Sequence, residues 1–353
     1  MNYTRDDLAV ITLGSVLVLE EKKKWELLER YDAPSDLFTE DFSAFLIRNG
    51  KKDVYNSIGE AFTEEYLSAL LSDYERKGIV AVPYTSALYP SPLRDYEAKP
   101  LVLYCMGKVE LLQEPTFCIV GSRKTLPNIL KVTEQIAWDL SEHFAIVTGA
   151  AEGGDYAATV GSIERGKTVC VFPCGLDFAV KKRVHERVRE RGLLVSPFPP
   201  SVSTRTYFYH IRNRIMAGMS RGVLVVSAGK KSGTLITAHC ALEYGKPVYA
   251  FPYTIGTASG EGANALLKKG AYPTENVLDI LPDFGINFER TPDPSLTDEE
   301  KLVLDCIREG EEVHVAQIGR LTNLDASALF AVLSALELKN RIVKSGGNKF
   351  RPV

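Results

Sequence analysis

The 353-residue sequence lacks several features, and each absence excludes a class of protein. No apolar run approaches the ~20 residues that a membrane-spanning helix needs. The first ten residues, MNYTRDDLAV, are acidic where a secretory signal peptide is basic, so we expect a cytoplasmic protein with no membrane partner. The six cysteines lie mostly within apolar runs, which is typical of reduced core thiols and argues against a disulfide framework.

Signatures of metal binding are also missing. The sequence contains no HExxH motif and no pair of CxxC motifs. Its five histidines are scattered, and none has a nucleophile at a suitable spacing. Cys170 and Cys174 bracket the end of a predicted strand, but no second pair of Cys or His residues accompanies them. We therefore predict no catalytic residue, no metal and no cofactor, and a protein that is not an enzyme.

The net charge of −3 hides an uneven distribution along the chain. Residues 1–114 hold 13 basic and 20 acidic side chains (−7), residues 115–285 hold 20 and 14 (+6), and residues 286–353 hold 9 and 11 (−2). The small net charge argues against an indiscriminate nucleic-acid binder. The positive field lies in the middle of the chain, where the glycine-rich turns are, and favours an anion site there.

The pattern of apolar residues predicts an N-terminal helical domain over residues 1–80 and an α/β domain over residues 81–285. In the first, apolar positions recur three and four residues apart. The expected helices are Asp6–Leu13, Glu21–Tyr31, Phe38–Asn49 and Glu60–Lys77. In the second, near-continuous apolar runs separated by helical segments indicate strands buried on both faces of a sheet. These runs are 117–120, 145–148, 168–172, 223–227 and 247–251.

Two helices of the α/β domain end in the same way, at Arg165-Gly166-Lys167 and Tyr244-Gly245-Lys246. In each, the glycine is placed to act as a left-handed cap before the next strand. The repeated unit of strand, loop and helix predicts a Rossmann-like, doubly wound, mostly parallel sheet.

A linker at residues 286–295 leads to a predicted winged-helix domain over residues 296–353. Three helices, at 297–309, 315–321 and 326–339, precede two short strands, which is winged-helix order. The third helix would read a duplex, but it has no basic residue before Lys339. We therefore favour a partner-binding or packing role for it over reading of the major groove.

The turn Gly121-Ser122-Arg123-Lys124 is the first candidate for an anion site. It follows a buried strand, and Pro127 begins a helix that runs to Leu140. A strand, a small-residue turn and a helix aim backbone N–H groups at an anion, and Arg123 adds donors suited to phosphate. Alone, the turn is weak evidence.

Three further glycine-rich turns should lie at the same carboxyl edge of the sheet. They are TGAAEGGDYAA at 148–158, SAGKKSGTLITA at 227–238 and SGEGANALLKKGA at 259–271. Any one of them could be an ordinary loop, but together they favour a phosphate-lined groove. Their candidate site residues are Gly153, Lys231, Ser232, Gly233, Thr234 and Asn264.

The segment RTYFYHIRNRIMAGMS at 205–220 predicts a helix with an arginine on its apolar face. At roughly 100° per residue, Arg212 falls on that face, while Asn213 and Arg214 point elsewhere. A buried arginine needs an anion, which Asp155 or a ligand phosphate could supply. The aromatic residues 207–209 could stack on bases or pack in the core, and both alternatives stay open.

A second basic helix is expected in VKKRVHERVRERG at 180–192, where the basic residues outnumber the two glutamates. It could be a solvated helix face, or it could steer a nucleic-acid strand, and the pattern does not decide between them.

Taken in order, IVGSRK, TGAAEGGD, RNRIMAGMS, SGTLITA and GANALLKKGA, followed by a winged helix, resemble the DNA-processing protein A (DprA/Smf) family. The resemblance covers about residues 80–285. It implies a single-stranded DNA-binding protein that forms a homodimer, loads the RecA recombinase and protects incoming DNA in natural transformation. It also implies a phosphate pocket at Gly121, Ser122 and Arg123, with Arg212 and Asn213 of the RNR motif beside the 232–234 turn.

Departures from the family pattern indicate a divergent member. Asn128 stands where a glycine is usual after the first turn, and Phe251-Pro252-Tyr253 stands where Pro-Gly is common. The main alternative is a nucleotide-processing enzyme similar to the phosphoribohydrolases (lysine-decarboxylase-like), which carry a PGGxGT turn with a nearby catalytic glutamate. Here the corresponding turn, KKSGTLIT, has no acid. A winged-helix regulator whose sheet senses a ligand is the third alternative.

Overall fold

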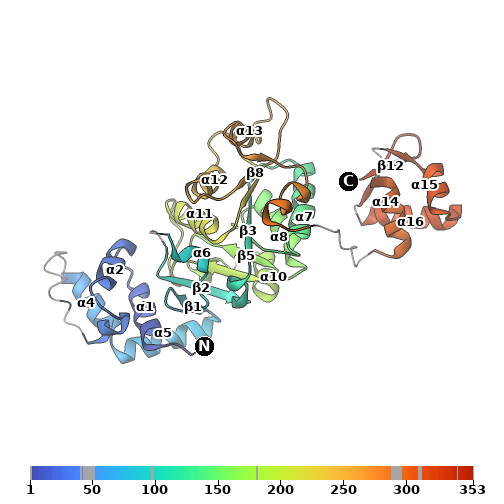
Figure 1. The fold of residues 1–353 in the computed structure, drawn as a ribbon. Coiled ribbons are helices and arrows are strands. Elements are labelled where there is room, and N and C mark those ends of the chain that lie inside the picture. The colour runs from blue at the N-terminus through green and yellow to red at the C-terminus, as the bar shows by residue number, and fades with distance from the viewer. Residues whose placement is uncertain are drawn as a thin grey trace. The chain divides into compact units, whose positions relative to one another are not determined.

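The computed structural model describes residues 2–39, 42, 52–96, 99–179, 182–287, 296–308, 312–339 and 341–352. The chain forms two compact units, Met1–Ile286 and Asn287–Val353 (Figure 1). Within the described residues, no single helix is long and apolar enough to span a membrane. Only the sharply bent helix pair Val315–Thr322 and Ala326–Leu338 meets the criteria of length and composition when the two helices are counted together.

A nine-stranded sheet organises the first unit, in the order β1-β2-β6-β5-β4-β3-β7-β8-β9. The strands are β1 (Val80–Pro83), β2 (Val102–Gly107), β3 (Thr116–Gly121), β4 (Ala145–Thr148), β5 (Thr168–Val171), β6 (Leu193–Ser196), β7 (Val223–Ser227), β8 (Val248–Ala250) and β9 (Tyr272–Pro273). The strands β6, β5, β4, β3, β7, β8 and β9, in their order across the sheet, are parallel to one another. β2 and β1 add an antiparallel edge beside β6. The predicted mostly parallel α/β sheet is therefore confirmed.

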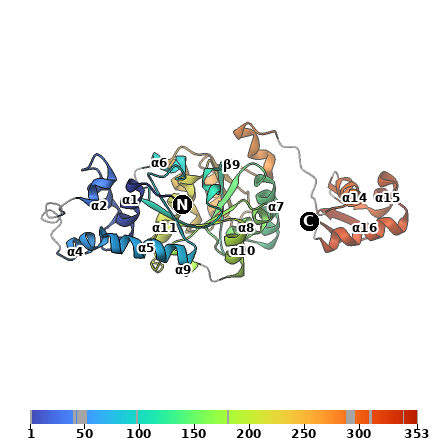
Figure 2. The same cartoon turned by 90° about the horizontal axis from the view of Figure 1, so that it is seen from below.

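Helices cover both faces of the sheet, with α7, α8 and α10 on one face and α6, α11 and α12 on the other (Figures 1 and 2). The α-helices of this part of the chain are α6 (Ser91–Arg94), α7 (Pro127–Leu140), α8 (Gly154–Ile163), α9 (Leu176–Ala179), α10 (Arg183–Arg191), α11 (Phe208–Met219), α12 (Thr234–Glu243) and α13 (Glu261–Leu267). The short 3-10 helices are η2 (Val109–Gln113), η3 (Val277–Asp279) and η4 (Leu281–Phe284). The chain winds from β3 to β6 in one direction and then returns to place β7 on the other side of β3. This makes the gap between β3 and β7 the switch point of the sheet.

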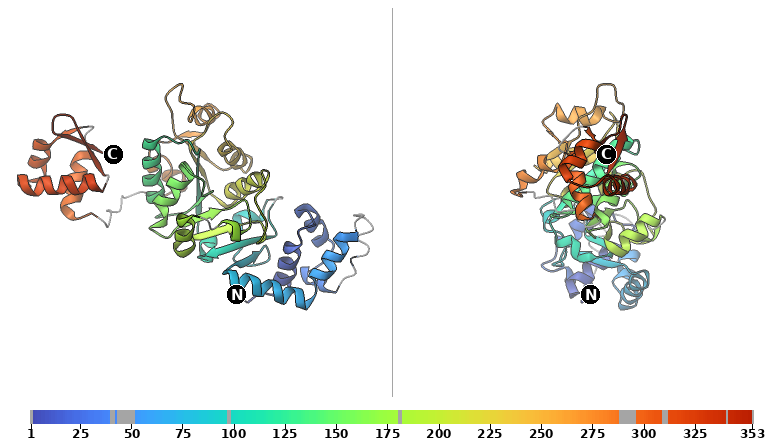
Figure 3. Two further views of the ribbon diagram at one scale, coloured as in Figure 1. Left: turned by 180° about the vertical axis from the view of Figure 1, so that it is seen from behind. Right: turned by 90° about the vertical axis from the view of Figure 1, so that its right-hand side faces the viewer.

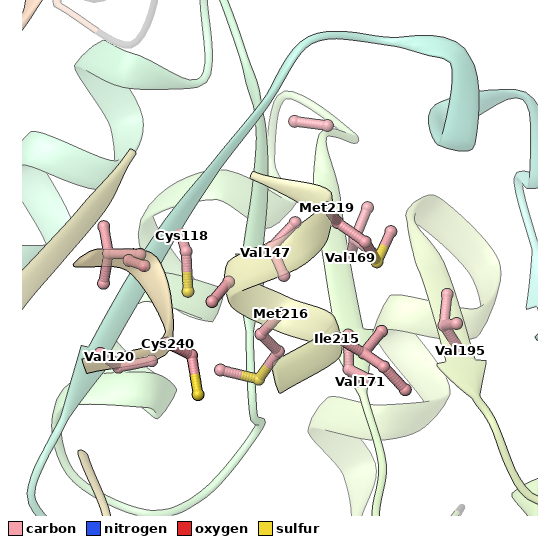
Figure 4. Packing of buried hydrophobic residues seen from close by; sticks show 14 of the residues in the cluster. Cys118, Val120, Val147, Val169, Val171, Val195, Ile215, Met216, Met219 and Cys240 are labelled. Atoms are coloured by element: carbon pink, nitrogen blue, oxygen red, sulfur yellow. The ribbon is translucent and has the colours of Figure 1, made fainter. Parts of the chain in front are cut away.

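The core on the α11 side is formed mainly by aliphatic residues of adjacent strands and of the helices that cover them. Figure 4 shows Ile215 and Met216 of α11 beside Val147, Val169 and Val171 of the sheet. Cys170, between two of these valines, belongs to the cluster on the opposite face, as expected for a strand buried on both sides. The packing fixes the rotation of α11 and therefore the direction in which its polar residues project.

Local signals in the sequence set the ends of several of these helices. Pro127 begins α7, as predicted. Gly166 and Gly245 both adopt left-handed backbone conformations, with φ of 70° and 67°, which confirms their predicted role as caps. The following N–H groups complete each cap, since Lys246 N donates to Ala241 O at 2.9 Å.

The N-terminal helices pack against the antiparallel edge of the sheet. They are α1 (Arg5–Ser15), α2 (Glu21–Leu28), η1 (Pro34–Phe38), α4 (Lys52–Ala61) and α5 (Glu64–Lys77). Val10 and Leu13 of α1 share one hydrophobic cluster with Val102 and Tyr104 of β2. The domain boundary expected at residue 80 stays a prediction.

One N-terminal helix prediction is wrong, and another lies largely outside the described residues. The expected continuous helix Glu60–Lys77 is interrupted, because Thr63 caps a new helix by accepting a hydrogen bond from Tyr66 N at 3.2 Å. Most of the expected helix Phe38–Asn49 falls outside the residues that the structure describes.

The second unit has the winged-helix fold, which confirms the prediction (Figure 3). Its elements are α14 (Asp298–Arg308), β10 (Val313–His314), α15 (Val315–Thr322), α16 (Ala326–Leu338), β11 (Ile342–Ser345) and β12 (Lys349–Pro352). The three strands pair in the order β10-β12-β11. β10 was not expected, since a two-residue strand leaves no periodic signal. Val303, Leu333 and Phe350 lie in the core of this unit.

Candidate anion-binding site

A cavity of about 400 Å³ opens at the carboxyl ends of β3 and β7, at the switch point of the sheet. It is lined by Val120, Gly121, Ser122, Arg123, Lys124, Ala151, Asp155, Tyr209, Arg212, Asn213, Ser232, Gly233, Thr234, Ile236 and Thr237. Nine of the twelve predicted site residues are in this lining. The other three, Gly153, Lys231 and Asn264, lie outside it.

The turn after β3 uses its first two N–H groups inside the protein. Gly121 N donates to Asp155 Oδ1 at 2.9 Å, and Ser122 N donates to Ser227 Oγ at 2.8 Å. The expectation that these N–H groups would face an anion is therefore wrong for both, because a carboxylate and a hydroxyl of the protein already occupy the acceptor positions. The side chains of Arg123 and Lys124, which are exposed, are the groups of this turn that remain available to a ligand.

Gly153 lies under the turn and allows the loops after β3 and β4 to touch. A Cβ at this position would lie 2.1 Å from Ser122 O and 2.9 Å from Arg123 Cα. Its φ of 85° is also in the region that favours glycine. Gly153 thus packs against the backbone of the Ser122-Arg123 turn and does not itself line the cavity.

The floor of the cavity is a buried pair formed by Arg212 of α11 and Asp155 of α8. Arg212 Nη1 lies 3.9 Å from Asp155 Oδ2, and both residues are buried. Asp155 also accepts hydrogen bonds from the backbone N–H groups of Gly121, Gly149 and Ala151. Of the two anions expected to face Arg212, the structure thus supplies the protein carboxylate.

Burial shifts both members of this pair toward neutrality. It raises the pKa of the Asp155 carboxyl and lowers the pKa of the Arg212 guanidinium, while the opposite charge of the partner acts against each shift. Nη1 of Arg212 is also 3.2 Å from Met216 Sδ, and its Nε has no hydrogen-bond partner among the described residues. A buried N–H without a partner is costly, so this pair carries an unsatisfied donor.

Asn213 positions the turn on the opposite wall. Its Nδ2 donates to Gly233 O at 3.1 Å, which ties α11 to the loop after β7. The expectation that Asn213 points away from the buried face is wrong: the side chain is buried, because this loop covers it. Helix α12 then begins at Thr234, so the positive end of its dipole lies at the cavity.

The three aromatic residues before Arg212 divide between the two roles that were left open. Phe208 is buried and stacks on Phe198, with ring centroids 4.0 Å apart. Tyr209 lines the cavity, and the Arg212 guanidinium lies 5.6 Å from its ring centroid. Tyr207 is 55% exposed, so it is available for contact with a ligand.

Two predicted site residues on the third and fourth turns lie beyond the cavity. Lys231 is exposed next to Ser232 and adds positive charge to the rim. The Asn264 amide is engaged with the backbone of Tyr253, accepting from its N at 3.0 Å and donating to its O at 2.9 Å. A ligand contact by Asn264 stays a prediction.

Sequence reasoning missed the supporting roles of Gly149, Ser227 and Thr125. Ser227 accepts from the Ser122 N–H and lies within hydrogen-bond distance of Thr125 Oγ1. Of these three residues, only Gly149 had a signal in the sequence, because it belongs to the glycine-rich turn TGAAEGGD. Within the described part of the chain, no group of three or more His, Cys, Asp or Glu side chains could hold a metal ion.

Comparisons with known proteins match both units of the chain. The family model of DNA recombination-mediator protein A matches residues 81–285, and the model of the DprA winged helix domain matches residues 289–348. The DNA processing protein DprA of Streptococcus pneumoniae is 33% identical over 200 residues, which are 56% of this chain and 71% of that protein. Protein Smf of Escherichia coli is 31% identical over 240 residues, which are 66% of this chain and 64% of that protein.

Two solved structures resemble this one. The X-ray structure of DprA from Streptococcus pneumoniae superposes with a TM-score of 0.66 and 26% identity, covering 82% of this chain and 100% of that chain. DprA from Helicobacter pylori, whose structure was solved for its single-stranded DNA binding mode, gives a TM-score of 0.53 and 27% identity, covering 58% of this chain and 95% of that chain.

Proposed function

The chain belongs to the DNA recombination-mediator protein A family of DNA-processing proteins, and we propose from this that it binds single-stranded DNA without regard to sequence. The observation that carries the proposal is the cavity between β3 and β7. The exposed cations Arg123 and Lys124 and the positive end of α12 converge there, beside the buried Arg212. Each of these groups favours a phosphate oxygen, and none of them distinguishes one base from another.

In this proposal the twelve predicted residues have different roles. Arg123 and Lys124 contact phosphates, and the 232–234 turn presents the α12 N-terminus. Arg212 and Asn213 hold the two walls in position, and Gly153 supports the first turn. Lys231 contributes to the field that attracts the strand, and Asn264 would act on the strand only from outside the cavity.

We extend the proposal to the partners that the family resemblance implies. The protein would form a homodimer, protect incoming single strands and load the RecA recombinase onto them during recombination or natural transformation. Action together with RecA would place it in the cytoplasm. The description of the family as recombination mediators supports this extension.

Binding without catalysis is the form of the proposal that the lining supports best. Asp155 is the one carboxylate in that lining. It is buried and accepts hydrogen bonds from three backbone N–H groups beside Arg212, so it is poorly placed to act as a general base. A phosphoribohydrolase-like activity would require an acid at the 230–237 turn, where the sequence has none.

The proposal is tested by titrating the protein with oligothymidylate at several salt concentrations. Log K should fall linearly with log salt, with a slope of about 0.7 for each phosphate neutralised on a single strand. Arg123→Ala should lower the slope by about that amount and weaken binding to oligonucleotides of every sequence alike. Arg76→Ala on α5 is the matched control, since that residue pairs with Asp73 on its own helix. Unchanged affinity of Arg123→Ala would reject the cavity as the phosphate site.

A further inference from the structure

A second group of exposed side chains lies next to the cavity, along the carboxyl edge of the sheet toward β5. Glu152 is in the loop after β4, beside the glycine that touches the Arg123 turn. Lys182, just before α10, donates to Glu152 Oε1 at 2.7 Å. A continuous series of contacts therefore runs from the Arg123 turn through Gly153 and Glu152 to Lys182, just before α10.

The same edge presents an aromatic ring and a further cation. Tyr156 is in the first turn of α8 and is 47% exposed. Arg183, the first residue of α10, is exposed and has no ion-pair partner among the described residues. Helices α8 and α10 pack against each other on one face of the sheet (Figure 2). Since helices run antiparallel to the strands that they connect, both of these helix beginnings lie at the cavity edge.

The other basic residues of α10 do not share this arrangement. Arg187 and Arg191 both pair with Glu164, and Arg189 lies near the end of the helix, toward the opposite edge of the sheet. The available positive charge of α10 is therefore concentrated at its beginning. This distinguishes a directed contact from a generally solvated basic face, the two alternatives that the sequence left open.

We propose that Tyr156, Lys182 and Arg183 form a second contact site for the DNA strand that leaves the cavity, and that Glu152 limits the affinity of this site. The inference rests on the proposed binding of single-stranded DNA. Two β-strand spacings, about 10 Å, separate the ends of β3 and β5. In this proposal the DNA strand therefore passes over Gly153 and continues toward α10. The two cations neutralise phosphates, and the Tyr156 ring offers a stacking surface to a base.

Glu152 has a defined effect in this arrangement. It lies between two cations, and both Lys182 and the charge of Arg123 lower the pKa of its carboxyl. It is therefore ionised at neutral pH and competes with DNA phosphate for Lys182. The strand must displace it to make the second contact.

The test compares oligothymidylates of about 4 and about 16 nucleotides, which are the ends of the range of site sizes known for OB folds. The double variant Lys182→Ala/Arg183→Ala should bind the long strand roughly tenfold more weakly, with a salt slope lower by about 1.4 for two lost phosphate contacts. Its affinity for the short strand should stay unchanged. Glu152→Gln should bind the long strand more tightly than the wild type, and Arg189→Ala, on the same helix, should behave as the wild type.

The outcomes separate this inference from the function on which it rests. A double variant with an unchanged salt slope for the long strand, or a Glu152→Gln variant that binds it no more tightly, would overturn the second contact site. If instead Arg123→Ala left binding of both strands intact, the cavity assignment would fail and the second contact site with it. Circular dichroism of each variant establishes that the fold is retained.

Discussion

The buried pair of Arg212 and Asp155 explains why particular small residues are required around the cavity. Arg212 fills the space directly above Gly149, so that a Cβ there would lie 1.6 Å from Arg212 Nη1 and 2.6 Å from Asp155 Oδ2. The carboxylate cannot retreat, because three backbone N–H groups hold it. At this position the glycine is required by the space that the arginine takes.

Gly149→Ala should therefore destabilise the protein and disrupt the cavity. The added methyl group must displace the guanidinium from its buried site, and overpacking of this kind costs about 1–3 kcal/mol of the free energy of unfolding. Urea denaturation measures the loss, and oligothymidylate titration should show weaker binding. Gly59→Ala is the control. Among the described residues, nothing apart from its chain neighbours and its own helix backbone lies within 4 Å of the place that its methyl group would take in α4, so it should stabilise the protein slightly. A Gly149→Ala variant as stable as the wild type would show that Arg212 is not confined as described.

Helix α11 is held by contacts near both of its ends. Its beginning carries Tyr209, Arg212 and Asn213 to the cavity, while its last turn is held by a lysine from the loop after α12. Lys246 Nζ donates to Ala217 O at 2.9 Å and to Gly218 O at 2.6 Å. A cation at these carbonyl groups also complements the negative end of the helix dipole.

This contact makes a prediction about pH. Burial lowers the pKa of the Lys246 ammonium to about 8, from 10.5. Between these values the unfolded chain holds the proton and the folded chain releases it, so the contribution of Lys246 to stability rises with pH across this window. The free energy of unfolding of the wild type, relative to that of Lys246→Met, should therefore increase between pH 8 and pH 10.5. Parallel pH profiles for the two proteins would contradict the assignment.

Elements with strong local signals were predicted well, and elements without them were missed. The buried runs at 117–120, 145–148 and 223–227 correspond to β3, β4 and β7, because strands covered on both faces need continuous apolar residues. β6 was not anticipated, since its four residues directly follow a highly charged helix. β9 has only two residues, and both are exposed. Short strands of this kind are defined by pairing with a neighbour and not by their own composition.

At the scale of the whole molecule, the topology of the sheet assembles the site from segments that are far apart in sequence. The reversal of winding between β3 and β7 brings the turn at 121–124 next to the turn at 232–234. The sequence could place both at the carboxyl edge, because that follows from the order of strands and helices. It could not show that Asp155, 34 residues away, accepts a hydrogen bond from the N–H of Gly121, since that contact depends on how α8 packs.

A crystal structure of the protein with a short oligothymidylate would test the central claim most directly. We predict a phosphate group in the cavity between β3 and β7, with the Arg123 side chain within hydrogen-bond distance of its oxygens and the N-terminus of α12 beside it. A strand bound elsewhere on the molecule, with this cavity filled only by water, would contradict the account.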